Sequence, residues 1–243
     1  LLLTVALYLA IPPVPAQEPV TCWRYQALSN LYTPPLAADM TPAPGQEILI
    51  CDSEARRLRC IDATGAPCWE YDGKWTKRLV SAPALSNPGA DGLRRIAIAN
   101  GDGSLTCLCA ATGTLLWRRE PGPVEWGGAL WMPGPAEKEQ TVVVATETTG
   151  VHAFSEGGDL LWHLSETQAS PPLLARGRLA AGDTDGDGHF ELVGTGRYGV
   201  FCASDTGHLL YAQNTGDEFP GGVALADADG NVLWHSNFQA TGD

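Results

Sequence analysis

The stretch Thr106-Cys-Leu-Cys-Ala-Ala-Thr-Gly113-Thr-Leu-Leu-Trp117 contains the pattern that decides the fold. Two short apolar runs are joined through Thr-Gly, and an aromatic residue follows the glycine by four positions. Thr-Gly supplies the positive φ angle that a tight hairpin needs. The stretch therefore predicts two adjacent strands, with the aromatic residue on the second.

The same Gly…aromatic pattern recurs along the chain at nearly constant intervals. It is found as Gly65…Trp69, Gly113…Trp117, Gly158…Trp162 and Gly207…Tyr211, with aromatic residues 48, 45 and 49 residues apart. Trp23 lies 46 residues before Trp69 and fits the same period, although no glycine stands four positions upstream. A period of about 40–50 residues, built from short strands and glycine turns, is typical of a propeller-like repeat array.

Two further β-rich runs precede each hairpin. The nearer runs are 48–51, 96–99, 142–145 and 192–195, and the more distant ones are 32–38, 81–85, 128–131 and 179–181. Four strands per unit make one propeller blade. We therefore predict an all-β protein, a β-propeller of four-stranded blades with about four complete blades and a partial one. The regular recurrence of the aromatic residues predicts packing between adjacent blades, in preference to a ligand-stacking platform.

The two ends of the repeat array predict an incomplete propeller. Trp23 would mark an outer strand that completes the last blade, because no inner strands precede it. After Tyr211, residues 223–227 and 232–235 would be the first and second strands of another blade. An alternative register places Gly230…Trp234 in the recurring Gly…aromatic frame. In either register, the propeller domain, expected over 18–243, stops within a blade and belongs to a longer propeller.

The N-terminal residues and the overall charge indicate an exported protein. Residues 1–17 combine a short apolar run with a Pro-rich segment, which is typical of part of a secretory signal peptide cleaved after Ala16. The run is too short for a comfortable membrane span, although an uncleaved anchor is the alternative. The net charge of −13 disfavours nucleic acid and anionic membranes as partners, or else serves solubility alone. We expect a secreted, periplasmic or cell-surface protein without a membrane span in the mature chain.

Seven cysteines in an exported chain invite disulfides, and the odd number leaves at least one unpaired within the chain. Cys51 and Cys60 flank a predicted hairpin turn centred near Ala55. Such a turn would place the two cysteines opposite each other, at a distance that a disulfide can bridge. The alternative is that the cysteines serve as small buried apolar residues.

The segment Asp183-Thr-Asp185-Gly-Asp187-Gly-His189-Phe-Glu191 is the sharpest local motif. Acids occupy positions 1, 3, 5 and 9, and glycines at positions 4 and 6 permit a sharp turn. Calcium takes six to eight oxygen ligands. We predict a structural Ca²⁺ held by Asp183, Asp185, Asp187, Glu191 and the backbone carbonyl of His189, with a metal-free acidic turn as the alternative. The corresponding segment 39–47 keeps acids only at positions 1 and 9.

The repeats resemble the quinoprotein-like, PQQ-type propeller family, whose repeat reads roughly Leu-x-Ala-x-Asp-x-x-Thr-Gly-x-x-x-Trp. The resemblance covers most of 22–211 and implies the fold. It does not carry over a quinone site, because the quinone-dependent dehydrogenases have a vicinal cysteine pair, whereas Cys107 and Cys109 here are separated by one residue. The acidic segment 183–191 is similar to the calcium loop of FG-GAP-type propeller repeats, as in integrin-like and related bacterial proteins.

The sequence shows no motif that demands catalysis. It has no Gly-x-Ser-x-Gly elbow, phosphate-binding loop or His-Glu-x-x-His zinc motif. We therefore predict a calcium-stabilised binding or assembly scaffold that recognises a protein or a carbohydrate through its face loops, without a catalytic site. The alternative is the N-terminal part of a propeller enzyme, either a quinone-dependent dehydrogenase or a polysaccharide lyase, whose catalytic residues lie in further blades.

Overall fold

The structure is a computed structural model that describes residues 24–124, 127–134, 139–168, 178–196, 199–214, 223–227 and 232–236. These residues form four four-stranded antiparallel sheets, one two-stranded sheet and a single turn of 3-10 helix, η1 (Glu166–Gln168). Each large sheet contains four strands that are consecutive in sequence and in space. The predicted all-β architecture of four-stranded propeller blades is confirmed. The expected signal peptide (1–17) and Trp23 lie outside the described residues.

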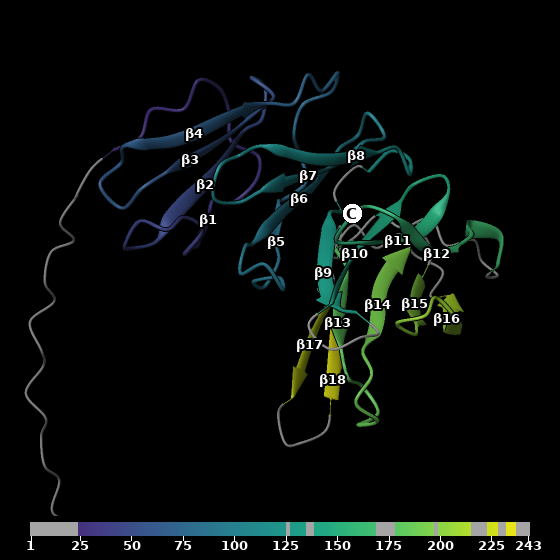
Figure 1. Ribbon diagram of the computed structural model, residues 1–243. Helices are drawn as coiled ribbons and strands as arrows, with labels where there is room; N and C mark the ends of the chain where they lie inside the picture. Colours follow the sequence, from purple (N-terminus) through teal and green to yellow (C-terminus); the bar gives the residue numbers. More distant parts are fainter. Residues whose placement is uncertain are drawn as a thin grey trace, which may run out of the picture.

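The four blades follow one another around an open arc (Figure 1). Blade 1 consists of β1 (Leu36–Ala38), β2 (Glu47–Asp52), β3 (Arg57–Ile61) and β4 (Pro67–Asp72). Blade 2 consists of β5 (Ala84–Leu85), β6 (Arg95–Ala99), β7 (Leu105–Cys109) and β8 (Leu115–Arg119). Blade 3 consists of β9 (Ala129–Pro133), β10 (Gln140–Thr146), β11 (Gly150–Ser155) and β12 (Leu160–Leu164). Blade 4 consists of β13 (Ala180–Gly182), β14 (Glu191–Gly196), β15 (Gly199–Ala203) and β16 (Leu209–Asn214).

A fifth blade begins with β17 (Val223–Asp227) and β18 (Val232–Ser236), which pair antiparallel. Strand β17 packs beside β13 just as β9 packs beside β5, so β17 takes the position of a first strand. Trp234 therefore lies on a second strand. This is the predicted first register, and the alternative Gly230…Trp234 frame is wrong.

The hydrophobic core is divided into layers that lie between successive blades. Consecutive residues of a strand point to opposite faces, so a second strand can contribute to the layers on both sides of its blade. The layers include Leu58 and Ile96 between blades 1 and 2, Ala97 and Val142 between blades 2 and 3, and Val143 and Leu192 between blades 3 and 4. This two-sided burial is the reason that the second strands read as continuous apolar runs.

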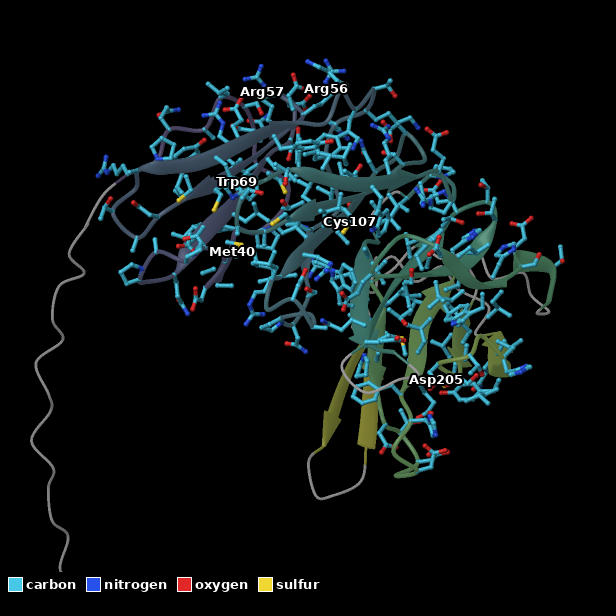
Figure 2. All side chains as sticks on the ribbon, viewed as in Figure 1. Met40, Arg56, Arg57, Trp69, Cys107 and Asp205 are labelled. Carbon is cyan, nitrogen blue, oxygen red and sulfur yellow. The ribbon has the colours of Figure 1, made fainter. Side chains whose placement is uncertain are left out.

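The recurring tryptophans connect each blade to the next one. Each indole N–H donates to a backbone carbonyl oxygen of the following blade. The pairs are Trp69 with Ala110 at 2.9 Å, Trp117 with Glu156 at 2.7 Å, and Trp162 with Asp205 at 2.7 Å. All three acceptors lie where the third strand of the following blade turns into the fourth. Figure 2 labels Trp69 where blade 1 faces blade 2. The predicted packing role is confirmed for these three tryptophans, whereas Tyr211 is 41% exposed.

The recurring glycines receive these same rings. A Cβ atom on Gly113 would lie 2.5 Å from the ring of Trp69, one on Gly158 would lie 2.7 Å from Trp117, and one on Gly207 would lie 2.6 Å from Trp162. Each of these three glycines therefore lies against the tryptophan of the preceding blade. The glycine is needed both for the positive φ angle of the turn and for the close approach of the ring.

We expect Gly113→Ala to lower the free energy of unfolding by about 2–4 kcal/mol, the sum of backbone strain and overpacking against Trp69. Gly92→Ala in the same blade is the matched control. Gly92 also has a positive φ angle (75° against 68° for Gly113), but no atom lies within 4 Å of its would-be Cβ. Gly92→Ala should therefore lower the free energy of unfolding only by the backbone strain, about 1–2 kcal/mol. Urea unfolding of both variants measures the difference, and equal losses would contradict the ring contact.

The predicted disulfide between Cys51 and Cys60 is wrong. Strands β2 and β3 pair Cys51 with Leu58, and Cys60 with Leu49. Both cysteines are buried free thiols. The hairpin turns one residue earlier than the sequence suggested, because the amide of Arg56 donates to the carbonyl of Ser53 and Arg56 adopts a positive φ angle of 58°.

Candidate metal centre and interaction surface

The acidic segment forms the loop between β13 and β14 at one end of blade 4. The pairing of Gly182 with Glu191 closes this loop. Inside it, Gly186 and Gly188 adopt positive φ angles of 80° and 90°. The sharp turn expected from the glycine positions is present, and it folds the acidic residues back on themselves.

Three of the predicted ligands come together in this loop. One carboxylate oxygen from each of Asp183, Asp185 and Asp187 lies within 4.8 Å of the other two. Asp183 is half-buried and held in place, since its two oxygens accept the amides of Gly186 at 2.7 Å and Gly188 at 3.0 Å. Asp185 and Asp187 are exposed. Three acidic groups this close repel one another, and a divalent cation among them would relieve the repulsion.

Glu191 is not part of this cluster of three aspartates. It is buried, and its Oε2 accepts both the amide of Thr184 at 2.7 Å and the hydroxyl of Thr184 at 2.6 Å. Glu47 begins the second strand of blade 1 as Glu191 does in blade 4, and it makes the same kind of contact. The carboxylate of Glu47 accepts the amides of Met40 and Thr41 and the hydroxyl of Thr41. An acid at this position therefore holds its loop closed through hydrogen bonds.

The pKa of Glu47 reflects this arrangement. Burial by itself raises it, but the hydrogen bonds from the Thr41 hydroxyl and from the amides of Met40 and Thr41 outweigh burial. The net result is a pKa below its usual value near 4.5. Because the pKa is lowered in the folded protein, the ionised carboxylate stabilises the fold at pH values above 4.5. This stabilisation is lost as the pH falls through the lowered pKa.

We expect Glu47→Gln to lower the free energy of unfolding by about 1–3 kcal/mol at pH 7, because buried amides lose a charged acceptor. The difference in the free energy of unfolding between the variant and the wild type should become smaller below pH 4.5, because the wild-type carboxyl then takes up a proton. Urea unfolding between pH 7 and pH 3 measures this, with the exposed Asp159→Asn as control. A difference that is constant over this range would contradict the role of the ionised form.

His189 and Asp205 connect the acidic loop to the rest of blade 4. The His189 Nδ1 lies 3.0 Å from a carboxylate oxygen of Asp205, in the β15–β16 turn. The hydrogen bond to Asp205 and the charges of Asp205, Asp187 and Asp183 raise the pKa of His189. The imidazole thus faces Asp205, which leaves only the backbone carbonyl of His189 for the role that the sequence assigned to it. Asp205 was missed in the sequence because it lies 16 residues away on another hairpin.

A hollow of about 240 Å³ lies at the opposite ends of blades 2 and 3. It is lined by Lys77 and Arg78 before β5, Gly101 of the β6–β7 turn, Pro123 and Val124 before β9, and Glu147 of the β10–β11 turn. Connections from two successive blades thus meet there, and both apolar and charged residues line the hollow. Within the described ranges, no helix is long and apolar enough to cross a membrane.

Residues 101–242, more than half of the chain, match the PQQ-type repeat family described as outer membrane protein assembly factor BamB. This chain belongs to that family. The matched region contains the hairpins that carry Trp117, Trp162 and Tyr211 and the acidic loop of blade 4. A comparison with curated proteins finds no match.

Solved structures show the same fold at low sequence identity. BamB from Moraxella catarrhalis is 14% identical with a TM-score of 0.51, over 84% of this chain and 57% of that chain. The europium-containing methanol dehydrogenase is 15% identical with a TM-score of 0.51, over 80% of this chain and 45% of that chain. BBS1N in complex with ARL6DN is 14% identical with a TM-score of 0.52, over 84% of this chain and 64% of that chain. This chain therefore spans less than two thirds of each of these chains.

Proposed function

We propose that this chain is the propeller part of an assembly scaffold that acts outside the cytoplasm and binds a protein partner through the loops of one propeller face. Membership of the family described as outer membrane protein assembly factor BamB carries this proposal. The segment 1–17, with its resemblance to a signal peptide, supports the export of the chain.

The hollow between blades 2 and 3 supports recognition of a protein. Its lining combines apolar residues, among them Pro123, with the charged Lys77, Arg78 and Glu147. Protein–protein interfaces also combine apolar contacts with polar and charged groups. Because the residues come from connections on two blades, a partner bound there would contact several loops at once.

Site-specific photo-crosslinking tests this assignment. A photoreactive residue at Lys77 or Glu147, in the full-length protein inside cells, should crosslink to a protein of the outer-membrane assembly machinery. The same group at Thr206, in the β15–β16 turn at the other end of the blades, is the control and should give little of this product. Crosslinks to polysaccharide alone would overturn the proposal in favour of a carbohydrate partner. Reduction of a redox dye by the purified protein with pyrroloquinoline quinone would overturn it in favour of the enzyme.

We also propose that the β13–β14 loop binds one structural calcium ion. Asp183, Asp185 and Asp187 would supply carboxylate oxygens, and the His189 carbonyl and Glu191 would complete the site. The convergence of three carboxylates within 4.8 Å supports this proposal. Isothermal titration of the purified protein should give one calcium ion per chain, and no binding to the wild type would overturn it.

A further inference from the structure

In each of the four blades whose four strands the structure describes, the third and fourth strands share a β-bulge. In blade 1 the register passes from the pair Cys60–Trp69 to the pair Ile61–Pro67, so Cys68 is the extra residue. The equivalent extra residues in blades 2, 3 and 4 are Leu116, Leu161 and Leu210. At a β-bulge two residues of one strand oppose a single residue of the other. Cys68 and Trp69 therefore both lie across from Cys60.

The two cysteines of this hairpin are cross-strand neighbours at the bulge. Cys68 follows directly after Pro67 and precedes Trp69, which are the cross-strand partners of Ile61 and Cys60, and it lies close enough to Cys60 to help raise the pKa of that thiol. Cys60 is fully buried in the layer between blades 1 and 2, whereas Cys68 is exposed. The pair thus combines a protected thiol with one that solvent can reach.

The other blades offer an internal comparison. Cys107 in blade 2 and Cys202 in blade 4 occupy the position of Cys60, each paired with the outer-strand aromatic residue. The bulge residue beside each of them is a leucine, Leu116 or Leu210, which has no thiol. Among the hairpins that the structure describes, the bulge brings two cysteines together only in blade 1.

We propose that Cys60 and Cys68 form a disulfide across the β3–β4 hairpin under oxidising conditions. The bond would fix the outer strand of blade 1 to its neighbour directly beside Trp69, whose ring and indole N–H contact blade 2. It would therefore stabilise the interface between blades 1 and 2. This inference is independent of the scaffold and calcium proposals.

The oxidation is a thiol–disulfide exchange with a small-molecule disulfide such as oxidised glutathione. The exposed Cys68 thiolate attacks one sulfur of the reagent, which forms a mixed disulfide and releases one reduced thiol. The Cys60 thiolate then attacks the Cys68 sulfur and displaces the second reduced thiol. Overall, two protein thiols are oxidised and one reagent disulfide is reduced to two thiols.

The pH dependence of this reaction follows from the location of Cys60. Burial, the nearby Cys68 and the charges of Glu47 and Asp62 raise the pKa of Cys60 to about 12, and burial also raises the pKa of Cys68. Because the thiolate is the attacking form, ring closure should be slow at pH 7 and accelerate about tenfold per pH unit.

The test treats the purified protein with oxidised glutathione at pH 8.5, alkylates the remaining thiols after unfolding and maps the peptides by mass spectrometry. We expect residues 60 and 68 to be joined, and Tm to rise by about 5 °C relative to the reduced protein. Cys68→Leu, which copies the other blades, should abolish both effects. Cys60→Ser should instead retain a glutathione adduct at Cys68, whereas Cys51→Ser should leave the bond intact. Alkylated Cys60 in the oxidised wild type, or a bond from Cys68 to a different cysteine, would overturn the proposal.

Discussion

Replacing Trp117 with alanine is expected to lower the free energy of unfolding by about 3–5 kcal/mol. The side chain is only 8% exposed, and its ring packs on Gly158 and lies 6.2 Å from the ring of Phe154. The Arg119 guanidinium lies 5.8 Å from the ring centre. Truncation would leave a cavity between blades 2 and 3 and deprive the Glu156 carbonyl of its indole donor.

Two control variants separate the parts of this effect. Trp117→Phe keeps much of the apolar area but lacks the N–H group, so it should cost about 1–2 kcal/mol less than alanine. Leu116→Ala changes the neighbouring residue, which is 47% exposed, and should cost no more than about 0.5 kcal/mol. Urea unfolding measures all three. If Trp117→Ala and Leu116→Ala had equal effects, the aromatic residues would not hold the blades together, and the ligand-platform interpretation would regain support.

The sequence predicted the blade pattern correctly because glycine turns and apolar runs are local signals. It could not show that Gly158 contacts Trp117 of the preceding blade. The Gly…aromatic spacing is the same whether the glycine contacts the aromatic residue of its own blade or that of the preceding blade. The Cys51–Cys60 error has another cause. A one-residue shift of a hairpin changes every cross-strand pair, and that shift depends on Arg56 adopting a left-handed backbone conformation that is rare outside glycine.

For the candidate metal site, the sequence located the loop and the three aspartates that converge there. The sequence pattern treated the acid at position 9, Glu191, as evidence for a calcium ligand alone. Glu191 and Glu47 both close their loops through hydrogen bonds to residues seven or six positions earlier, so an acid there has a structural reason of its own. The link from His189 to Asp205 was hidden because it joins two different hairpins, and only the folded blade brings them together.

Saturating calcium is expected to raise Tm by about 5–10 °C. An ion present at about 100 times its dissociation constant stabilises the folded state by about 2.7 kcal/mol, and each kcal/mol corresponds to about 2–4 °C for a chain of this size. The double variant Asp185→Ala with Asp187→Ala should lose the whole increment. Its Tm without calcium should stay close to that of the wild type, because relief of the repulsion among three carboxylates offsets the loss of the hydrogen bonds that Asp185 and Asp187 accept from the Asp187 and His189 amides. Asp159→Asn, an exposed acid in blade 3, should keep the increment. Identical melting of the wild type in calcium and in chelator would contradict the site.

Glu191→Gln then distinguishes the two roles of Glu191. If the carboxylate only closes the loop through Thr184, the variant should melt at a lower temperature both with and without calcium, and the calcium increment should persist. If Glu191 is also a ligand, the increment itself should shrink, because an amide is a weaker calcium ligand than a carboxylate. We expect the increment to fall by at least half, since the calcium proposal includes Glu191 in the site. Glu47→Gln is the matched control in blade 1, and it should lower Tm without changing the calcium increment. The two variants together test whether the acid at this position contributes to calcium binding in blade 4 and only to loop closure in blade 1.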